Sequence, residues 1–388
     1  MNKERDGNKH RILLVAHNMQ YGGAEKVFLN VLKHLDRNVF IPYVASPQGP
    51  MLEKIYPLCE KVLIVREARL PSYFDFIGYF KAVYECLLNL IPLIKFFKRN
   101  NIDIVFSNTS SIFHGMIAAR LVRLPAVTMI HEMIHPIYLR KFRFKLIYSL
   151  NRRVMLISNA MLREFDPSGT RSRLVRINEA IDLSEFDTSS KNVPFDQYGI
   201  NDRTFVIGLV GSLHVLKGHA YFIRMAAEVI KKVQNVKFLI IGRYTQAELQ
   251  YYHDLLRLRD TLGVSEYVTI TGFVPDLLSL MNRLDILAIC SFTEGMSLVA
   301  LEAMALRKPV VTFDVGGMAE ALADHITGRV IPFGEYREMA EAVITILQDK
   351  KMAKSMGEAG RKKVEKDFNI ENQRKKLREV WINILNSK

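Results

Sequence analysis

Residues 284–317 read LDILAICSFTEGMSLVALEAMALRKPVVTFDVGG, and this stretch decides the fold class. Its first seven residues form a short apolar run, which is typical of a strand buried on both faces of a parallel sheet. A polar turn follows, and Ser297 is a suitable N-cap for a helix that ends before Pro309, because proline disfavours helix in the residue before it. A second apolar run begins there. This order predicts a β–α–β unit.

Two glutamates stand in this unit at positions that suit a ligand. Glu294 follows the first strand, and Glu302 comes eight residues later on the expected helix. Ligands of open parallel sheets bind at the carboxyl edge of the strands. Helix N-terminal amides suit a diphosphate, and carboxylates accept hydrogen bonds from sugar and ribose hydroxyls, so the unit suits a nucleotide-sugar. Two solvated glutamates explain the same spacing, and the spacing alone does not decide between these interpretations.

Composition and charge limit the function classes. The chain has 388 residues, enough for two domains, and its 49% hydrophobic and 24% charged residues are those of an ordinary globular protein. The net charge of +14 favours an anionic partner, which could be a nucleotide, a phospholipid surface or a nucleic acid. No nucleic-acid-binding motif is visible, so we expect no nucleic-acid partner.

Cysteine usage and the N-terminal segment indicate the compartment. Cys59, Cys86 and Cys290 are widely separated and have neither a disulfide framework nor metal-ligand spacing. The polar N-terminal segment lacks the hydrophobic core of a signal peptide. We therefore expect a cytoplasmic protein, with a place at the inner face of the cell membrane as a further expectation.

Two segments favour contact with a membrane surface. Residues 70–97 are apolar, but charged residues and Pro92 interrupt them, so we expect an amphipathic helix and not a span. Residues 138–153 combine six arginines or lysines with interspersed apolar residues. This second segment could rest on an anionic membrane face, or it could be a solvated basic helix packed on its domain.

The alternation of strands and helices extends along the whole chain and is broken once. The break predicts an N-terminal domain over 1–188, a linker over 189–203 and a second α/β domain over 204–368. A last amphipathic helix is expected over 369–388.

Four further positions follow expected strands. The Gly22–Gly23 pair could let the backbone approach a ligand, although such a pair taken alone more often forms a tight turn. His131 could exchange or orient a proton of an acceptor hydroxyl, or it could be structural. Lys217 could bind phosphate and Arg243 could face the same site, while solvated surface side chains are the alternative for both.

These stretches also match a known family. In chain order they are GGAE at 22–25, HE at 131–132, GSLHVLKGH at 211–219, EGMSLVALE at 294–302, VGGMAE at 315–320 and GRVIP at 328–332. Together they resemble the family 4 retaining glycosyltransferases of the GT-B fold. The resemblance covers nearly the whole chain. It implies two Rossmann-like domains facing each other across a cleft, with a C-terminal helix that crosses back to the N-terminal domain.

The resemblance also implies roles for individual residues. Glu302 would hold the ribose hydroxyls, Glu294 the transferred sugar, and Lys217 would neutralise the leaving phosphate. His131 would face the reacting sugar. The catalytic positions would be His131, Lys217 and Glu294, and the donor-binding positions Gly22, Gly23, Ser212, Lys217, Arg243, Phe273, Val274, Glu294, Gly295, Met296, Ser297, Leu298 and Glu302.

Two positions depart from the family pattern. Ser212 stands where the family usually has arginine, and Asn178-Glu179-Ala180 stands where it usually has an Asn-Gly step. Ser212 leaves one fewer fixed positive charge for the diphosphate. We predict that Arg243 or the general positive field supplies part of that charge.

The function implied is transfer of a hexose or N-acetylhexosamine from a nucleoside diphosphate sugar, with UDP or GDP as the nucleotide, to an acceptor hydroxyl. The acceptor would be a glycan or a lipid-linked sugar in cell-surface polysaccharide or glycolipid synthesis. No Asp-x-Asp-like metal motif stands at a strand end, so we expect neither metal nor cofactor. A GT-B-like sugar-nucleotide epimerase and a non-catalytic sugar-nucleotide-binding membrane scaffold are the alternatives.

Overall fold

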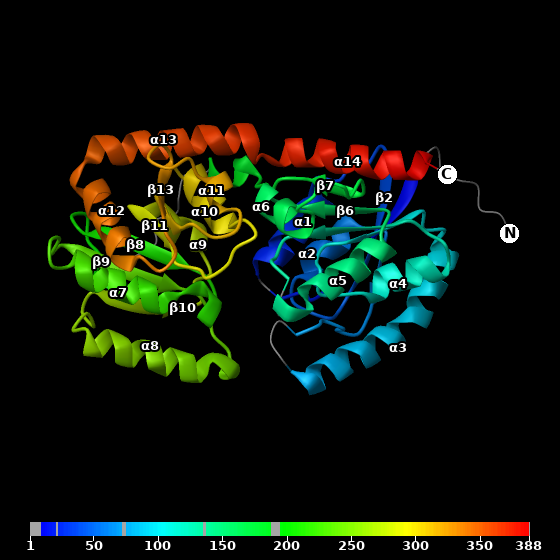
Figure 1. Ribbon diagram of the computed structural model, residues 1–388, viewed down its shortest axis with the longest axis horizontal. Coiled ribbons are helices and arrows are strands. Elements are labelled where there is room, and N and C mark those ends of the chain that lie inside the picture. Colours follow the sequence, from blue (N-terminus) through cyan, green and yellow to red (C-terminus); the bar gives the residue numbers. More distant parts are fainter. Residues whose placement is uncertain (1–8, 21, 72–74, 135–136, 188–194, 388) are drawn as a thin grey trace. The chain divides into compact units, whose positions relative to one another are not determined.

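The computed structural model describes residues 9–20, 22–71, 75–134, 137–187 and 195–387. It separates into two compact units, each with its own parallel sheet (Figure 1). Unit 1 comprises residues 1–181 and 370–388, and unit 2 comprises residues 182–369. This architecture confirms the predicted α/β class with two Rossmann-like domains.

Unit 1 contains a seven-stranded parallel sheet in the order β3-β2-β1-β4-β5-β6-β7. The order reverses between β1 and β4, so loops after these strands meet at a topological switch point. The central strands are buried on both faces, as their continuous apolar runs require. The strands are β1 His10–Val15, β2 Phe40–Ser46, β3 Lys61–Ile64, β4 Ile104–Ser107, β5 Ala126–Ile130, β6 Arg153–Leu156 and β7 Leu174–Arg176.

The helices of unit 1 connect these strands. They are α1 Gly23–Lys33, α2 Leu52–Ile55, the 3-10 turn η1 Tyr56–Leu58, α3 Phe76–Asn100, α4 His114–Leu121, α5 Ile137–Leu150, α6 Asn159–Phe165 and α14 Ile370–Asn386. The basic segment predicted over 138–153 forms most of α5. Its buried Phe144 stacks on Phe165 of α6, with ring centroids 4.2 Å apart, so α5 packs on the unit.

Helix α3 packs on unit 1 through one narrow face. Asp75 caps its first turn by accepting a hydrogen bond from the Gly78 amide at 2.9 Å, and Asn101 ends it in the left-handed conformation. Among the described residues α3 is the one helix long and apolar enough, by length and composition, to cross a membrane; 22% of its most apolar window is buried. Its exposed side also carries apolar side chains, so burial is one-sided while the apolar residues are not.

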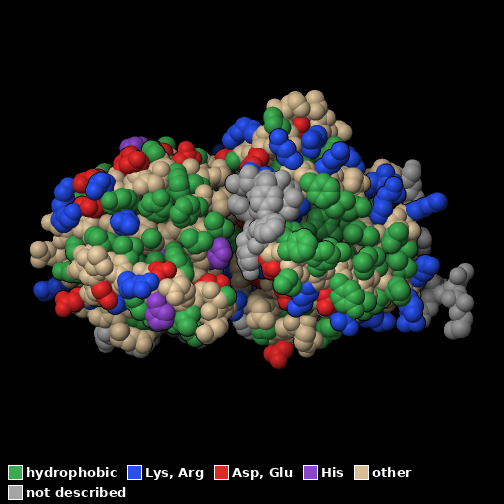
Figure 2. Space-filling view, turned by 60° about the horizontal axis from the view of Figure 1, so that its bottom comes forward, with side chains coloured by type: hydrophobic (Ala, Val, Ile, Leu, Met, Phe, Trp, Pro, Cys, Tyr) green, Lys and Arg blue, Asp and Glu red, His purple; other side chains and the backbone are tan. Residues whose placement is uncertain are grey.

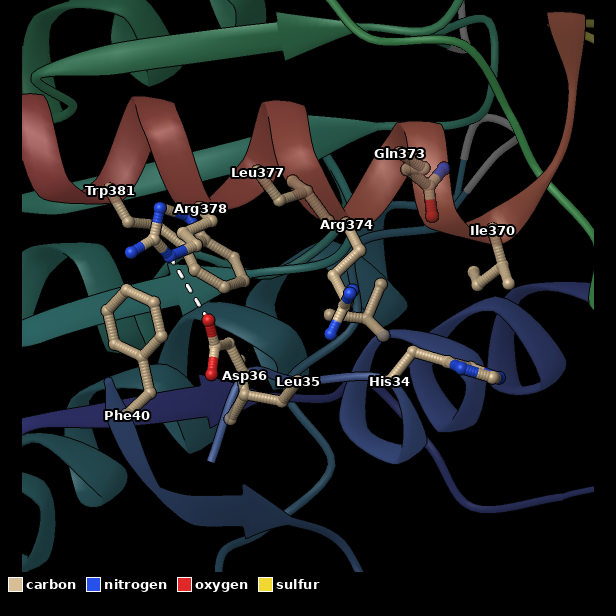
Figure 3. A pocket seen from close by; sticks show the side chains of 11 residues that line it. His34, Leu35, Asp36, Phe40, Ile370, Gln373, Arg374, Leu377, Arg378 and Trp381 are labelled. Atoms are coloured by element: carbon tan, nitrogen blue, oxygen red, sulfur yellow. Dashed lines mark ion pairs between the residues drawn. The ribbon is translucent and has the colours of Figure 1, made fainter. Parts of the chain in front are cut away.

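Helix α14 joins the core of unit 1, although residues 182–369 separate it from the rest of that unit (Figure 3). The Trp381 indole is 1% exposed and meets the rings of Phe40 and Phe106 edge-on, at centroid distances of 5.4 and 5.3 Å. Arg378 pairs with Asp36 at 3.1 Å beside a small pocket between α1 and α14. The predicted return of the last helix to the N-terminal domain is confirmed.

Unit 2 contains a six-stranded parallel sheet in the order β10-β9-β8-β11-β12-β13, with its switch point between β8 and β11. The strands are β8 Phe205–Val210, β9 Val236–Ile241, β10 Val268–Gly272, β11 Ile286–Ile289, β12 Val310–Phe313 and β13 Gly328–Ile331. The helices are η2 Leu183–Phe186, η3 Asp196–Tyr198, η4 Val215–Lys217, α7 His219–Val229, η5 Gln246–Glu248, α8 Leu249–Thr261, α9 Leu277–Arg283, α10 Leu298–Ala305, α11 Met318–Ala321, α12 Tyr336–Gln348 and α13 Lys350–Asp367.

The predicted β–α–β unit over 284–317 corresponds to β11, α10 and β12. The Ser297 hydroxyl caps α10 by accepting a hydrogen bond from the Ala300 amide at 3.4 Å. The helix ends at Ala305, and Arg307 follows in the left-handed conformation. Strand β12 begins three residues after Arg307.

Residues 182–187 belong to unit 2, where Asp187 binds Arg361 of α13 at 2.8 Å. Part of the predicted linker, 189–194, lies outside the described residues.

Candidate functional site

The candidate donor site lies at the carboxyl edge of the unit 2 sheet, where the loops after β8, β9 and β11 meet. The Leu213 amide donates to the Arg243 carbonyl at 3.0 Å, so the loops after β8 and β9 are joined. Ser212 and Arg243 are both exposed at this edge. Arg243, which is predicted to supply part of the positive charge missing at Ser212, therefore lies in the loop next to that serine.

Lys217 and Glu294 form an ion pair at this edge. The lysine Nζ lies 2.7 Å from the Glu294 Oε1, which also accepts a hydrogen bond from the Ser291 hydroxyl at 2.8 Å. The side chains are 36% and 12% exposed, so the carboxylate is the more enclosed partner. Sequence reasoning selected both residues separately, and the structure brings them together across 77 positions of the chain.

Close backbone approach holds the Lys217 loop against the loop after β11. Gly218 ends the η4 turn with φ +68°, and a Cβ atom there would overlap the Cys290 carbonyl. The Phe292 amide donates to the Leu216 carbonyl at 2.9 Å. Only glycine meets both requirements at position 218, and the Lys217 ammonium is therefore held in front of β11.

The N-terminal end of α10 forms the floor of this edge. Gly295, Met296 and Ser297 are buried, and Glu302 is 6% exposed one turn further along the helix. The first amides of a helix lack intrahelical acceptors and attract anions. Gly316, at φ +54°, passes so close to the Glu294 carbonyl that a Cβ atom would overlap it.

The predicted donor-binding positions after β10 lie at the same edge. Phe273 and Val274 follow β10 directly, and the Phe273 side chain is 60% exposed. The Gly242 amide donates to the Gly272 carbonyl at 3.1 Å, which joins this segment to the loop that carries Arg243. All predicted donor positions of unit 2 therefore share one sheet edge.

In unit 1, His131 directly follows β5 and is enclosed by polar partners. Its Nδ1 lies 2.6 Å from Oε2 of Glu179, and its Nε2 lies 2.8 Å from Oδ1 of Asn108, which follows β4. Burial alone would lower the pKa of His131, but the carboxylates of Glu179 and Glu132 raise it above its ordinary value. Sequence reasoning missed both partners as site residues, although it singled out Glu179 as a departure from the family pattern.

Glu132 organises the loop after β4. Its Oε1 accepts hydrogen bonds from the hydroxyls of Thr109 and Ser110, both at 2.7 Å, and from the Ser110 amide at 2.9 Å. Burial opposes ionisation, but these donors and the neighbouring His131 lower the pKa of Glu132. The carboxylate is therefore ionised at neutral pH and orients the loop beside His131.

Gly22 and Gly23 lie exposed at the N-terminal end of α1. Gly22 is the N-cap residue in an extended conformation, and its carbonyl accepts a hydrogen bond from the Lys26 amide at 3.0 Å. The pair follows the carboxyl end of β1, while Tyr21 lies outside the described residues.

A wider search of the part of the chain that the structure describes finds no group of three or more His, Cys, Asp or Glu residues that could hold a metal ion.

Comparison with known proteins agrees with this fold and these motifs. The family described as Glycosyltransferase Family 4 matches residues 21–185, and that described as Glycosyl transferases group 1 matches residues 190–363. The chain belongs to the glycosyltransferases of the family 4 type, which have the GT-B fold.

Among curated relatives, the alpha-D-kanosaminyltransferase of Streptomyces kanamyceticus is 33% identical over 45% of each chain. A D-inositol 3-phosphate glycosyltransferase of Mycolicibacterium smegmatis is 30% identical over 49% of this chain and 43% of its own length. The chain thus spans less than half the length of these relatives. The capsular polysaccharide biosynthesis glycosyltransferase CapM of Staphylococcus aureus is 23% identical over 74% of this chain and 78% of its own.

Solved structures share the whole fold. Anabaena HepE, solved with UDP and glucose, has a TM-score of 0.81 at 21% identity, over 96% of this chain and 100% of HepE. A glycosyltransferase from Rickettsia africae also has a TM-score of 0.81, at 19% identity, over 98% of this chain and 100% of its own. At such identities the likeness shows the fold alone.

Proposed function

We propose that this protein is a retaining, metal-independent glycosyltransferase that moves a hexose or N-acetylhexosamine from a nucleoside diphosphate sugar to an acceptor hydroxyl. The observation that carries the proposal is the Lys217–Glu294 pair, 2.7 Å apart, beside the N-terminal end of α10. A buried helix end and a fixed ammonium group together form a receptor for a diphosphate at the carboxyl edge of a sheet.

In this proposal the residues act mainly by placing charge. The Lys217 ammonium and the first amides of α10 stabilise the negative charge that develops on the departing diphosphate. Glu294 orients the ammonium and accepts hydrogen bonds from the transferred sugar, while Glu302 accepts them from the ribose. His131 takes part from unit 1 as the residue that faces the reacting sugar. A lysine and a helix end then take the place of a divalent cation.

UDP is the first nucleotide to test, because HepE was solved with UDP and with UDP-glucose. Thermal-shift screening of UDP- and GDP-sugars should give a clear stabilisation with one donor, which Glu302→Ala abolishes. Product analysis with and without a chelator then separates the alternatives. A new glycoside that forms in chelator supports the proposal, whereas an epimerised donor, no reaction, or strict dependence on a divalent metal contradicts it.

We further propose that the acceptor is a glycan or a lipid-linked sugar and that the protein meets it at an anionic membrane surface from the cytoplasmic side. The named role of CapM in capsular polysaccharide synthesis supports this acceptor class. The structural support is the outer face of α3, which exposes apolar side chains in a single stripe. Figure 2 shows apolar side chains gathered over a broad area of this side of unit 1. The stripe consists of Phe76, Ile77, Phe80, Val83, Tyr84, Leu87, Leu88 and Ile91.

Positive charge borders this stripe. Exposed lysines and arginines lie on α3 itself, and Phe142 of α5 adds another exposed ring, at 68% exposure. The basic residues concerned are Lys81, Lys95, Lys98 and Arg99 of α3 with Lys141 and Lys145 of α5. Such a combination of an apolar stripe with a cationic border matches the interface of an anionic bilayer.

Vesicle binding tests this surface. Ile77 is 80% exposed and Phe80 62% exposed, so replacing each by aspartate should weaken binding to anionic vesicles roughly tenfold or more per residue. Ile326→Asp in unit 2, at a position as exposed as Phe80, is the matched control and should bind like the wild type. If the wild type does not bind anionic vesicles at low salt, the membrane proposal is wrong.

A further inference from the structure

The surroundings of His131 define its charge state through geometry. Asn108 donates from Nδ2 to the Ala24 carbonyl at 3.3 Å, which fixes the orientation of its amide group. The amide oxygen of Asn108 is then the atom that faces Nε2 of His131, at 2.8 Å. Because that oxygen only accepts hydrogen bonds, Nε2 must carry a proton.

The second ring nitrogen faces a carboxylate. Nδ1 lies 2.6 Å from Oε2 of Glu179, and the two side chains are 8% and 2% exposed. A carboxylate only accepts hydrogen bonds, so in the ion-pair form of this contact Nδ1 carries a proton as well. The other carboxylate oxygen of Glu179 is buried and has no hydrogen-bond partner, so the ring is the one described donor to this carboxylate.

We propose that Glu179 is a positioning residue that holds His131 as a doubly protonated imidazolium, so that the ring serves as a fixed positive charge and hydrogen-bond donor and cannot act as a base. This inference rests on the proposed function only where it concerns the sugar substrate. Glu179 lies in the Asn178-Glu179-Ala180 segment, which departs from the Asn-Gly step of the family pattern. Toward a substrate the ring then offers Nε2–H to an oxygen of a hydroxyl or phosphate group, in place of the Asn108 carbonyl.

Other charged groups around the ring agree with this assignment. Glu132, on the residue after His131, is ionised and also favours the imidazolium. His17, after β1, has its pKa lowered to about 4, mainly by burial, and is therefore neutral at pH 7. Glu25 of α1 lies 3.1 Å from His17.

Two arginines complete the charged surroundings. Arg143 of α5 interacts with Glu132. Arg69 contributes to the lowered pKa of His17. The carboxylates of Glu179 and Glu132 are the groups that favour the imidazolium of His131, while His17 is neutral at pH 7 and adds no positive charge beside it.

Ring nitrogen NMR of the free protein tests the charge state without any substrate. The His131 signals are assigned by their absence in His131→Gln. In the wild type at about pH 7 we expect the two ring nitrogens to have the similar shifts of an imidazolium. In Glu179→Gln the ring should titrate about 1–3 pH units lower, because an adjacent carboxylate shifts a pKa by that amount.

Two further variants keep this test interpretable. Glu179→Gly, which removes the whole side chain, should lower the titration in the same way if the glutamine variant does not fold. Glu53→Gln, at an exposed position of α2, should leave the titration unchanged. A single neutral tautomer in the wild type at pH 7, or an unchanged titration in both Glu179 variants, would overturn the inference.

Activity then separates this inference from the proposed function. If His131 serves the reaction as an imidazolium, the alkaline limb of kcat/KM should move to lower pH in Glu179→Gln together with the ring titration. A ring that shifts while the pH profile stays fixed removes His131 from the proposed reaction. The assignment of the charge to Glu179 would still stand on the spectra.

Discussion

Replacing Lys217 by methionine removes the ammonium group and keeps most of the volume of the side chain. If that ammonium stabilises the departing diphosphate, its loss should lower kcat about 10²–10³-fold, the usual effect of removing one fixed donor from a developing oxyanion. The KM for the donor should change less, because the charge on the leaving group grows during the reaction.

The fold itself should tolerate this change. The Lys217 side chain is 36% exposed, and such partly exposed ion pairs contribute only about 0.2–1 kcal/mol to the free energy of unfolding. The melting temperature should therefore fall by no more than about 4 °C. Lys231→Met is the matched control, because Lys231 also pairs with a glutamate of unit 2, Glu228, at 2.5 Å and on the exposed surface.

The assay is initial-rate kinetics with the donor found by thermal shift, measured for the wild type and both lysine variants. An unchanged kcat in Lys217→Met would refute the reasoning, even with a raised KM. That result would mean that the lysine binds the donor equally in the ground and transition states. A loss of kcat in the Lys231 control would show that the effect is not specific to the site.

Three further predictions follow from the packing and the charges. Trp381→Ala should lower the free energy of unfolding by about 3–5 kcal/mol, since it empties the buried space between α14 and the sheet; an unchanged urea midpoint would contradict the packing. Arg243→Ala should weaken donor binding about two- to fivefold in titration calorimetry, whereas Arg257→Ala on the exposed face of α8 should not. Gly218→Ala should destabilise unit 2 by more than about 1 kcal/mol and lower activity, because the new Cβ would overlap the Cys290 carbonyl; full activity and stability would show that the η4 turn adapts.

Local signals in the sequence predicted the fold well. The strand, cap, helix and proline step over 284–317 each depend on neighbouring residues, and Ser297 indeed caps α10. The edge on which the site residues gather also follows from the sequence, because parallel strands place their carboxyl ends together. Lys217 and Glu294 could thus be expected at one edge, although not at hydrogen-bond distance.

Features that depend on distant parts of the chain could not be predicted. Glu179 lies 48 positions from His131, and no local pattern indicates that its side chain turns toward the ring. Which face of α3 is exposed could not be predicted for a related reason. A helix with apolar residues on most sides does not reveal which side the rest of the domain covers.

The return of α14 to unit 1 has a consequence for biosynthesis. Unit 2 is one continuous segment, but the core of unit 1 lacks Trp381 until all of residues 182–369 have been translated. At ordinary translation rates the nascent unit 1 waits roughly 10–40 s for its last helix. During that time the edges of Phe40 and Phe106 that meet the Trp381 indole lack this partner, and a chaperone bound to the nascent chain would shield them.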